Sequence, residues 1–178
     1  MQKSSEFWIQ SLELRPHPEG GYYTETYQSP DWISVAGLPA RYTAERVCAK
    51  AIYFLLPEGQ VSTFHRLKCE EIWCYHLGAP LTVSLIEENG TLRHVILGPH
   101  VDEGEQLQVL IPHGVWFGAR ITTQDAYSLI SCITAPGFDF EDFELADRRA
   151  LLTTYPQHQE IIRRLTYSEK ERETHRAS

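Results

Sequence analysis

Long apolar runs are missing from this sequence. No stretch approaches the roughly 20 consecutive apolar residues of a membrane-spanning helix, and the N-terminal MQKSSEFWIQSLEL has no apolar segment long enough for a signal peptide. Basic residues are also few, with 16 Lys and Arg against 24 Asp and Glu and a net charge of −8. Nucleic acids and anionic membranes attract basic surfaces. The sequence therefore argues against both as partners and predicts a cytoplasmic protein.

Several recognisable patterns are absent as well. The four cysteines form no C-x-x-C pair and no zinc-type spacing, so we expect reduced thiols that are mostly buried. There is no glycine-rich phosphate cradle of the P-loop or dinucleotide-binding kind. The sequence contains no internal repeat, linker or low-complexity segment, and its length suits one domain. A single domain over residues 1–178 is predicted.

Short β-type segments make up most of the chain. Alternation of apolar and polar residues, bounded by turn residues, predicts strands at residues 22–28, 51–56, two within 59–78, and 81–86, 92–97, 107–111, 115–121 and 127–134. Asn89 and Gly90 between two alternating runs are a strong hairpin signal. Turn signals recur about every ten residues with no helix between them, which predicts an antiparallel sandwich or barrel over residues 21–135.

A short helix is predicted near the N-terminus, within residues 1–16. Ser4 or Ser5 would cap it, and Trp8 and Leu12 belong to its apolar stripe. The helix must end before the proline that follows it at position 16.

The pattern changes again after the last predicted strand. Residues 136–166 begin with a phenylalanine-rich turn and continue as two short helices, 144–152 and 157–165, which Pro156 separates. Residues 167–178 are almost wholly polar, and we predict a mobile tail there.

The candidate site lies in residues 59–78, GQVSTFHRLKCEEIWCYHLG. Side chains alternate with a period of two along a strand, and paired strands lie only about 5 Å apart. We therefore predict two antiparallel strands that pair with each other and carry His65, Glu71 and Tyr75 on one face. Parity adds to this face Val61, Thr63, Leu67, Trp73 and Leu77. It assigns to the other face Ser62, Phe64, Arg66, Ile72, Cys74 and His76.

The spacing of this stretch resembles a known motif. The positions Gly59, His65, Leu67, Glu71 and Gly78 are similar to the first cupin motif, G-x5-H-x-H-x3-E-x6-G, with Leu67 in place of its second histidine. The resemblance implies an all-β fold, the cupin double-stranded β-helix or jelly-roll barrel, with short helices at both ends of the chain.

Two further features refine the resemblance. The second cupin motif has a weaker echo in Gly104, Pro112, Gly114 and Phe117, where Phe117 replaces a metal-binding histidine. The stretches PEGGYYTETYQS, STFHRLKCEEIW and PGFDFEDFELADR resemble the cupin branch called Cupin_5, a family of largely unknown function. Cys74 departs from that pattern, which implies a histidine at its position.

The resemblance also bears on metal binding. Cupins hold a metal with two histidines and a glutamate of the first motif and a histidine of the second, and only His65 and Glu71 remain here. We therefore predict no metal cofactor. The alternative is a divalent transition metal held by His65, Glu71 and His113, because a catalytic metal usually needs three protein ligands.

Without a metal, the same residues can transfer protons. A carboxylate beside an imidazole orients it and raises its pKa, which suits a general base. We predict His65 as the base, Glu71 as the residue that orients it, and Tyr75 as a proton donor. The candidates for ligand binding are Glu25, Thr63, Trp73 and Phe117.

Three functions remain open. Metal-free cupins of the dTDP-4-dehydrorhamnose 3,5-epimerase type resemble this arrangement, which implies isomerisation or epimerisation of a small polar metabolite such as a sugar derivative. The second is a binding protein for a nucleotide or sugar, and the third a metal-dependent oxygenase or lyase with a reduced ligand set. His65 and Glu71 could also be a buried pair that only satisfies its own hydrogen bonds.

The resemblance implies an oligomer as well. Cupins often dimerise by exchanging edge strands or packing sheets together, which removes exposed strand edges. We predict a homodimer whose contact involves the N-terminal helix and the first strand.

Overall fold

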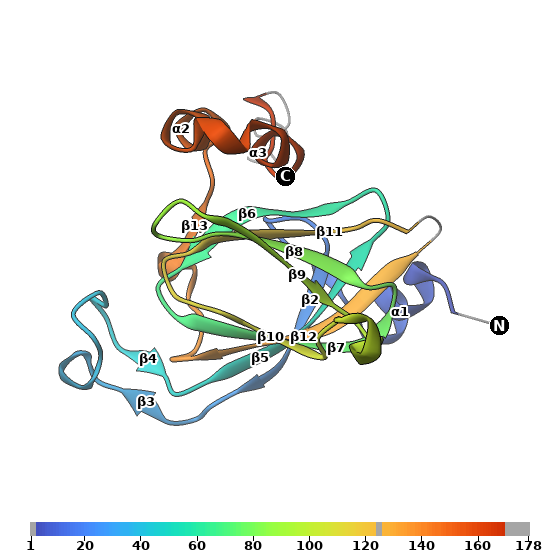
Figure 1. Ribbon diagram of the computed structural model, residues 1–178. Coiled ribbons are helices and arrows are strands. Elements are labelled where there is room, and N and C mark those ends of the chain that lie inside the picture. Colours follow the sequence, from blue (N-terminus) through green and yellow to red (C-terminus); the bar gives the residue numbers. More distant parts are fainter. Residues whose placement is uncertain (1–2, 124–125, 170–178) are drawn as a thin grey trace.

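Two antiparallel β-sheets face each other as a sandwich in the computed structural model (Figure 1), which describes residues 3–123 and 126–169. The six-stranded sheet contains, in spatial order, β1 (Arg15–Pro16), β2 (Tyr22–Gln28), β5 (Lys50–Pro57), β12 (Tyr127–Ala135), β7 (Glu70–Gly78) and β10 (Gln108–Ile111). The five-stranded sheet contains β13 (Phe143–Leu145), β6 (Val61–Leu67), β11 (Trp116–Ile121), β8 (Leu81–Ile86) and β9 (Leu92–Leu97). The all-β prediction is confirmed.

The main hydrophobic core lies between the two sheets. Phe54 and Trp73 project from the six-stranded sheet and Leu85 and Phe117 from the other, and each is at most 1% exposed. Inward-facing residues of two packed sheets interdigitate in this way because every second side chain of a strand points to the same face. The alternation visible in the sequence is therefore the signature of this core.

The predicted pairing of the two motif strands is wrong. β6 pairs with β11 and β13, whereas β7 pairs with β12 and β10 in the opposite sheet. Residues 68–69 turn the corner between the sheets, and the backbone N–H of Lys68 donates to the Asp142 carbonyl at 3.1 Å. The physical reason lies in β6, because its two edges are already paired with β11 and β13 and leave no free edge for β7.

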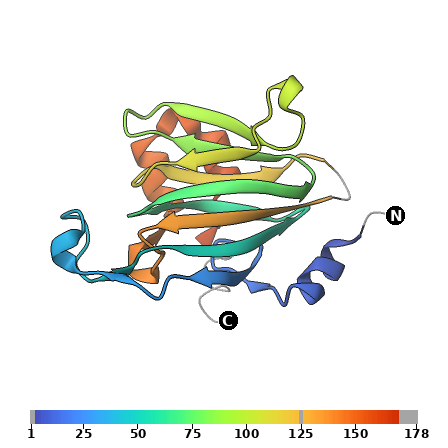
Figure 2. The same ribbon diagram turned by 90° about the horizontal axis from the view of Figure 1, so that it is seen from below.

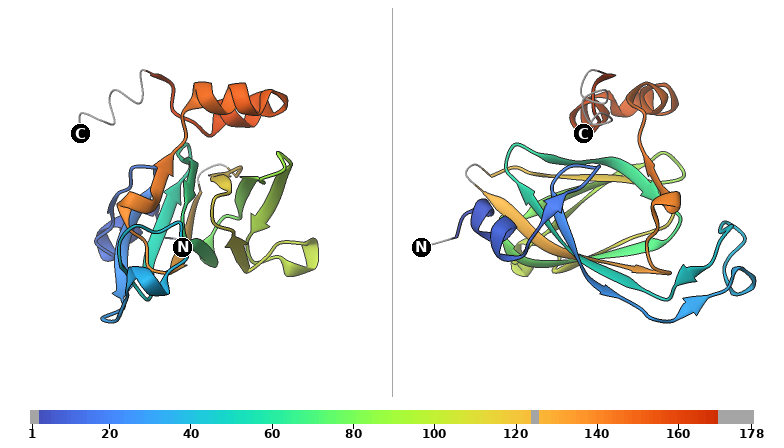
Figure 3. Two further views of the ribbon diagram at one scale, coloured as in Figure 1. Left: turned by 90° about the vertical axis from the view of Figure 1, so that its left-hand side faces the viewer. Right: turned by 180° about the vertical axis from the view of Figure 1, so that it is seen from behind.

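Helices at the C-terminal end cover the outer face of β6 (Figure 3). They are α2 (Arg148–Thr154), the 3-10 turn η4 (Pro156–His158) and α3 (Gln159–Arg164). Phe64 of β6 is fully buried in a cluster with Leu151, Ile162 and Leu165 of this segment.

The first C-terminal helix starts later than predicted. Residues 143–145 form β13, in which Leu145 pairs with His65. The helix then begins after Asp147, whose side chain caps it by accepting a hydrogen bond from the Ala150 N–H at 2.9 Å. The tail predicted at residues 167–178 lies outside the described residues from position 170 onward.

The N-terminal helix α1 (Ser5–Ser11) has the predicted cap, since the Ser4 side chain accepts a hydrogen bond from the Phe7 N–H. Trp8 packs against a cluster that includes Leu55 and Leu129 of the six-stranded sheet. Figure 2 shows α1 in dark blue at one end of this sheet. Further along, β3 (Trp32–Ile33), the turn η1 (Val35–Gly37) and β4 (Arg46–Val47) form an arm beyond the sandwich (Figure 1). No helix in the described residues is long and apolar enough to cross a membrane.

Beyond α1, the outer face of the six-stranded sheet carries an apolar row. Strand registers align Tyr27, Ala51, Ile133, Ile72 and Leu110 across five neighbouring strands. Tyr27 and Leu110, at the two ends of the row, are 52% and 53% exposed. This apolar row is the part of the sheet that α1 leaves uncovered. The 3-10 turns η2 (Val101–Glu103) and η3 (Phe140–Asp142) complete the fold.

Candidate functional site

A cavity of about 250 Å³ opens at one end of the sandwich. The β1–β2 loop, the start of β7, the end of β12 and residues 138–143 meet there. Its volume is the liquid volume of about eight water molecules, which suits a ring-sized metabolite. Its ionisable interior groups are His17, Glu19, His65, Glu71 and Cys132.

The carboxyl group of Glu19 lies against β6 and contacts His65. Glu19 Oε2 is 3.2 Å from His65 Nε2, and Oε1 accepts a hydrogen bond from Ser62 Oγ at 2.8 Å. The backbone carbonyl of Glu19 also accepts from the Thr63 N–H at 2.8 Å. Gly20 permits this close approach, because a Cβ there would lie 2.2 Å from the Val61 carbonyl oxygen. The loop is therefore held tightly on the strand that carries the imidazole.

The tautomer of His65 follows from its second contact. Nδ1 lies 2.7 Å from the Thr63 carbonyl oxygen, which can only accept, so Nδ1 carries a hydrogen. Burial lowers the pKa of His65 to about 4, and the Thr63 carbonyl opposes part of this shift. Burial, together with the Glu71 charge, raises the pKa of Glu19 well above its usual range. Since Nδ1 carries the ring hydrogen, the 3.2 Å contact between Glu19 Oε2 and His65 Nε2 requires one further proton between these two atoms, and the directions of the two pKa shifts favour its place on Glu19.

His17 completes the inner cluster from the same loop. Its Nδ1 lies 3.3 Å from Glu19 Oε2 and accepts a hydrogen bond from the Glu19 N–H at 3.3 Å. Its ring contacts Tyr23 edge-on, with centroids 4.7 Å apart. Burial lowers the pKa of His17 to about 3, and the nearby His65 adds to the effect. This imidazole is neutral and acts as a wall beside Glu19.

Glu71 projects into the same cavity from the opposite sheet. Its side chain is deeply buried, with the residue only 8% exposed, and its Oε2 has no hydrogen-bond partner among the described residues. Burial raises the pKa of Glu71 to about 7, and contacts with Trp73 and Cys132 oppose part of the rise. A buried polar atom without a partner costs about 1–3 kcal/mol. A ligand that pairs with Oε2 would recover this free energy.

Three phenylalanines, Phe138, Phe140 and Phe143, form an aromatic wall at the cavity mouth. The rings of Phe138 and Phe140 contact edge to face, with centroids 5.0 Å apart. Phe143 also lies against His65, at 5.3 Å between ring centroids. The wall gives the cavity an apolar side that a flat ring can contact.

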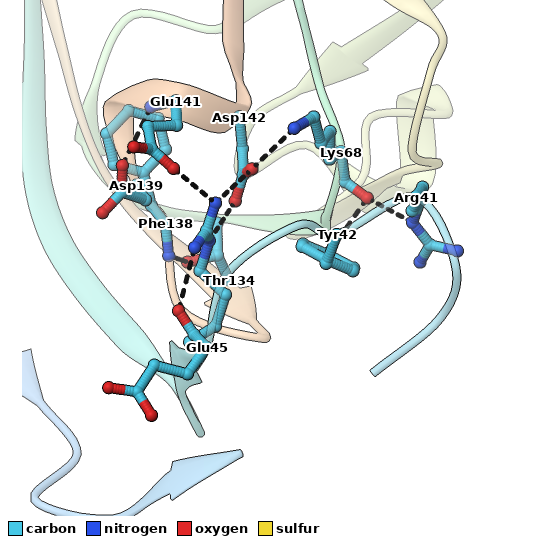
Figure 4. A network of polar contacts seen from close by, with 10 residues as sticks. Arg41, Tyr42, Glu45, Lys68, Thr134, Phe138, Asp139, Glu141 and Asp142 are labelled. Carbon is cyan, nitrogen blue, oxygen red and sulfur yellow. Dashed lines mark hydrogen bonds and ion pairs between the residues drawn. The ribbon is translucent and has the colours of Figure 1, made fainter. Parts of the chain in front are cut away.

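A polar network holds the aromatic wall in place (Figure 4). Asp142 binds Arg46 through two hydrogen bonds of 2.6 and 2.7 Å and also contacts Lys68 Nζ at 3.3 Å. The Thr134 hydroxyl accepts a hydrogen bond from the Phe138 N–H at 2.8 Å. Because Asp142 and Arg46 are almost fully buried, this two-point ion pair fixes the segment with little freedom.

Comparison with known proteins identifies the family. The family model described as Cupin superfamily (DUF985), Cupin_5, matches residues 6–146. The chain belongs to the Cupin_5 family.

Relatives of this Cupin_5 chain include an uncharacterised protein of Saccharomyces cerevisiae, YML079W. It is 30% identical over 143 residues, which span 75% of this chain and 71% of the yeast protein. Two solved structures match with a TM-score of 0.84 each: a hypothetical protein from Leishmania major, and protein SO0799 from Shewanella oneidensis. The first is 37% identical over 93% of this chain, the second 40% identical over 94%, and both matches cover those chains entirely.

More distant matches show the fold alone. Oxalate decarboxylase of Bacillus subtilis matches with a TM-score of 0.53 and 16% identity. The match covers 89% of this Cupin_5 chain and 38% of the decarboxylase. This shared fold is the cupin barrel that the first motif implied.

The residues of the Cupin_5 chain do not fit a cupin metal. Leu67 lines the cavity where the first motif has a histidine. The Phe117 ring lies 4.0 Å from the His65 ring, where the second motif has another histidine. His113 lines a separate pocket. Within residues 3–123 and 126–169, no group of three His, Cys, Asp or Glu side chains is arranged to hold a metal ion.

The structure brings together only some of the predicted site residues. His65, Glu71 and Glu25 line the cavity, and Glu25 Oε2 contacts Lys50 Nζ at 3.5 Å at its edge. The residue that contacts the His65 imidazole as an ion-pair partner is Glu19, whereas Glu71 was predicted to orient it. Tyr75 faces inward beyond the buried Trp73, and its hydroxyl donates to the Gly78 carbonyl at 2.7 Å. The described residues that line the cavity do not include Tyr75.

Trp73 and Phe117 are core residues behind the cavity. Both are 1% exposed, and their rings contact each other edge to face at 5.8 Å. They were predicted to bind the ligand, but the described lining does not include them. The Phe117 ring instead packs against the His65 ring, with centroids 4.0 Å apart.

Thr63 was predicted to bind the ligand, but it is fully buried and the described lining of the cavity does not include it. A β-bulge in β6 accounts for this difference. Phe117 pairs with His65 and Ala119 with Ser62, so two residues of β6 lie opposite Gly118 alone. A bulge breaks the period-two count, so Ser62 reaches Glu19 on the His65 side, contrary to the predicted faces. Gly118 is needed there, because a Cβ would lie 2.8 Å from the Ser62 carbonyl oxygen.

The sequence reasoning missed Glu19 and His17, which lie in the β1–β2 loop. A signal was nevertheless present. His17 lies between two prolines, and Glu19 follows the second of them directly before a pair of glycines. Glu19 belongs to the first Cupin_5 stretch, and His17 directly precedes that stretch. Polar residues in such a tightly constrained loop are candidates for function rather than for solvent contact.

Proposed function

We propose that the cavity catalyses a metal-independent proton transfer, an isomerisation or epimerisation, on a small polar metabolite such as a sugar derivative. One observation carries the proposal: two separate proton-carrying groups face the same small cavity from opposite sides. They are Glu71 on one side and the Glu19–His65 pair on the other. Perturbed pKa values of neighbouring groups in a cleft are typical of acid–base sites.

Glu71 is suited to act as the base. With a pKa of about 7 it exists in both protonation states at neutral pH, which is the best compromise for a group that must both take and return protons. Its unpaired Oε2 leaves a lone pair available to a substrate.

The Glu19–His65 pair is suited to act as the acid. In the first step, the Glu71 carboxylate takes the proton of a C–H next to a carbonyl, and the carbonyl oxygen takes the proton that Glu19 shares with His65. The product of this step is an enol. In the second step the hydroxyl on the carbon that lost its hydrogen gives its proton to the Glu19–His65 pair, and the former carbonyl carbon takes the proton from Glu71, so that carbonyl and hydroxyl have exchanged places. The protein ends in its starting state.

The lining supports a ring-bearing ligand. The aromatic wall offers an apolar face, while Arg15, Lys50 and Glu25 at the edge offer charged partners for hydroxyl groups. The same features favour the second candidate function, binding of a sugar or nucleotide without reaction. The third candidate, a metal-dependent oxygenase or lyase, has no supporting feature of its own in the described residues.

Hydrogen exchange with solvent tests the proposal without a known product. The protein is incubated in heavy water with a panel of aldoses, ketoses, their phosphates and nucleotide-linked sugars, and NMR follows the loss of C–H signals. We expect one class of compound to exchange the hydrogen next to its carbonyl. Glu71→Gln should slow this exchange at least about 100-fold, the usual contribution of a general acid or base.

The matched control is Glu70→Gln, because Glu70 is the exposed neighbour of Glu71 on the same strand. It should exchange like the unaltered protein. A panel without any exchange, or an exchange that persists in Glu71→Gln and His65→Asn, would contradict the proposed reaction. Saturable binding of a panel member without exchange would instead support the binding function.

A further inference from the structure

A second and larger cleft lies beside the β1–β2 loop. Its volume is about 530 Å³, and it is bounded by Gly20 and Gly21 of this loop, by Gly59 in the turn before β6, and by the residues at the end of α3. His17 lines both this cleft and the proton-transfer cavity, so the loop forms a wall of each.

Arginines dominate the charge of this cleft. Arg148, Arg163 and Arg164 line it, and the described lining contains no carboxylate. The chain as a whole carries a net charge of −8. A local concentration of positive charge in an acidic protein is unexpected from composition, and we call this feature the arginine cleft.

Two of the three guanidinium groups keep their charge available. Arg148 Nε donates to Thr166 Oγ1 at 2.8 Å, and its Nη2 donates to the Arg163 carbonyl at 3.0 Å and to the Thr166 carbonyl. All three acceptors are neutral, so they leave the positive charge uncompensated. The Arg163 side chain has no hydrogen bond or ion pair to the described residues. Arg164 contacts Glu160 at 3.2 Å, a pair in which both side chains are exposed. Such exposed pairs are weak.

The wall opposite the arginines is ordered and mostly backbone. The Gly21 N–H donates to Gln60 Oε1 at 3.1 Å, which ties the β1–β2 loop to the turn before β6. At Gly59 an added Cβ would have no atom within 4 Å, so the space above this residue is open. A compact ligand can therefore approach the backbone here.

We propose that the arginine cleft binds a small molecule that carries a phosphate or diphosphate group. Guanidinium groups pair with phosphate oxygens through two parallel hydrogen bonds, which a carboxylate or a phosphate accepts and a neutral ligand does not. The overall negative charge opposes a long polyanion, so the ligand is a metabolite and not a nucleic acid. This binding site is independent of the proton transfer proposed for the neighbouring cavity.

Calorimetric titration with inorganic pyrophosphate at constant ionic strength tests the site. We expect saturable binding, and Arg163→Ala should weaken it about tenfold or more, as the loss of a hydrogen bond between charged groups does. Arg93→Ala is the matched control, because Arg93 is exposed on β9 and pairs with Glu87, away from the cleft. It should bind like the unaltered protein. Thermal melting without pyrophosphate checks that both variants fold.

An NMR titration of the unaltered protein gives a second readout. Pyrophosphate should shift the backbone amide signals of Gly20, Gly21 and Gly59 and leave those of Gly104 and Gly114 unchanged, since these two glycines lie outside the cleft. The proposal is overturned by absence of saturable binding, by equal weakening in Arg163→Ala and Arg93→Ala, or by shifts centred on Gly114. Because none of these measurements involves turnover, their failure leaves the proton-transfer proposal standing.

Discussion

Replacing Glu71 by Gln should change how the stability of the protein depends on pH. Burial raises the pKa of Glu71 from its ordinary 4.5 to about 7. A carboxyl group with a raised pKa stabilises the folded state below its unfolded pKa, and this contribution is lost as the pH rises through the folded pKa. In the unaltered chain Glu71 therefore lowers the free energy of unfolding as the pH rises from 4.5 to 7. Glutamine does not ionise, so Glu71→Gln removes this loss.

The size of the effect follows from the shift. One pKa unit corresponds to about 1.4 kcal/mol, so the full shift corresponds to about 3 kcal/mol. Most of it, about 2–3 kcal/mol, develops between pH 5 and pH 8. The difference in unfolding free energy between Glu71→Gln and the unaltered protein should increase in favour of the variant by this amount over that range.

Urea denaturation at pH 5 and pH 8 measures this difference. Comparing two pH values cancels the constant cost of placing an amide at this position. Glu70→Gln, on the exposed side of the same strand, should show the same difference at both pH values. If the difference for Glu71→Gln is equal at pH 5 and pH 8, or moves in the opposite direction, the carboxyl group is not buried as described.

Three further predictions concern the aromatic wall, assembly and metal content. Asp142→Asn breaks the buried contact with Arg46 and should lower the free energy of unfolding by about 3–5 kcal/mol. Glu144→Gln, in an exposed pair with Arg66, should lower it by less than about 1 kcal/mol. Urea denaturation measures both values. Light scattering should give twice the 20.5 kDa chain mass, because the apolar row beside α1 favours burial in a homodimer, and a monomer mass would refute this. Elemental analysis of untagged protein should find less than one transition metal per chain; a stoichiometric metal would mean that His65 and Glu71 have acquired another ligand.

Much of the fold could be predicted from local patterns. Apolar alternation and turn residues depend on a few neighbouring positions, so β2, β8 and β9 have the predicted bounds, and the Asn89 and Gly90 turn joins the last two. The cap of α1 at Ser4 is equally local. These features need no knowledge of the rest of the chain.

Sheet membership and the partners of the site were not predictable in this way. β6 and β7 lie in opposite sheets because the edges of β6 pair with β11 and β13, strands that come much later in the chain. The bulge opposite Gly118 likewise depends on a distant strand. Glu19 reaches His65 from 46 positions earlier in the chain, across a contact that no spacing rule connects. The motif therefore located the cavity, while the residue beside the imidazole had to be found in three dimensions.

The division of β6 and β7 between two sheets has a mechanical consequence. His65 is carried by one sheet and Glu71 by the other, and in the described residues no hydrogen-bonded ladder joins β6 directly to β7. The β1–β2 loop starts and ends in the sheet of Glu71, and its Glu19 is hydrogen-bonded to β6 of the other sheet. The separation of the two proton-carrying sides is therefore set by this loop and by the packing of side chains between the layers. Any sliding or spreading of one sheet against the other changes that separation. The distance between Glu71 and the Glu19–His65 pair therefore depends on how closely the two sheets pack.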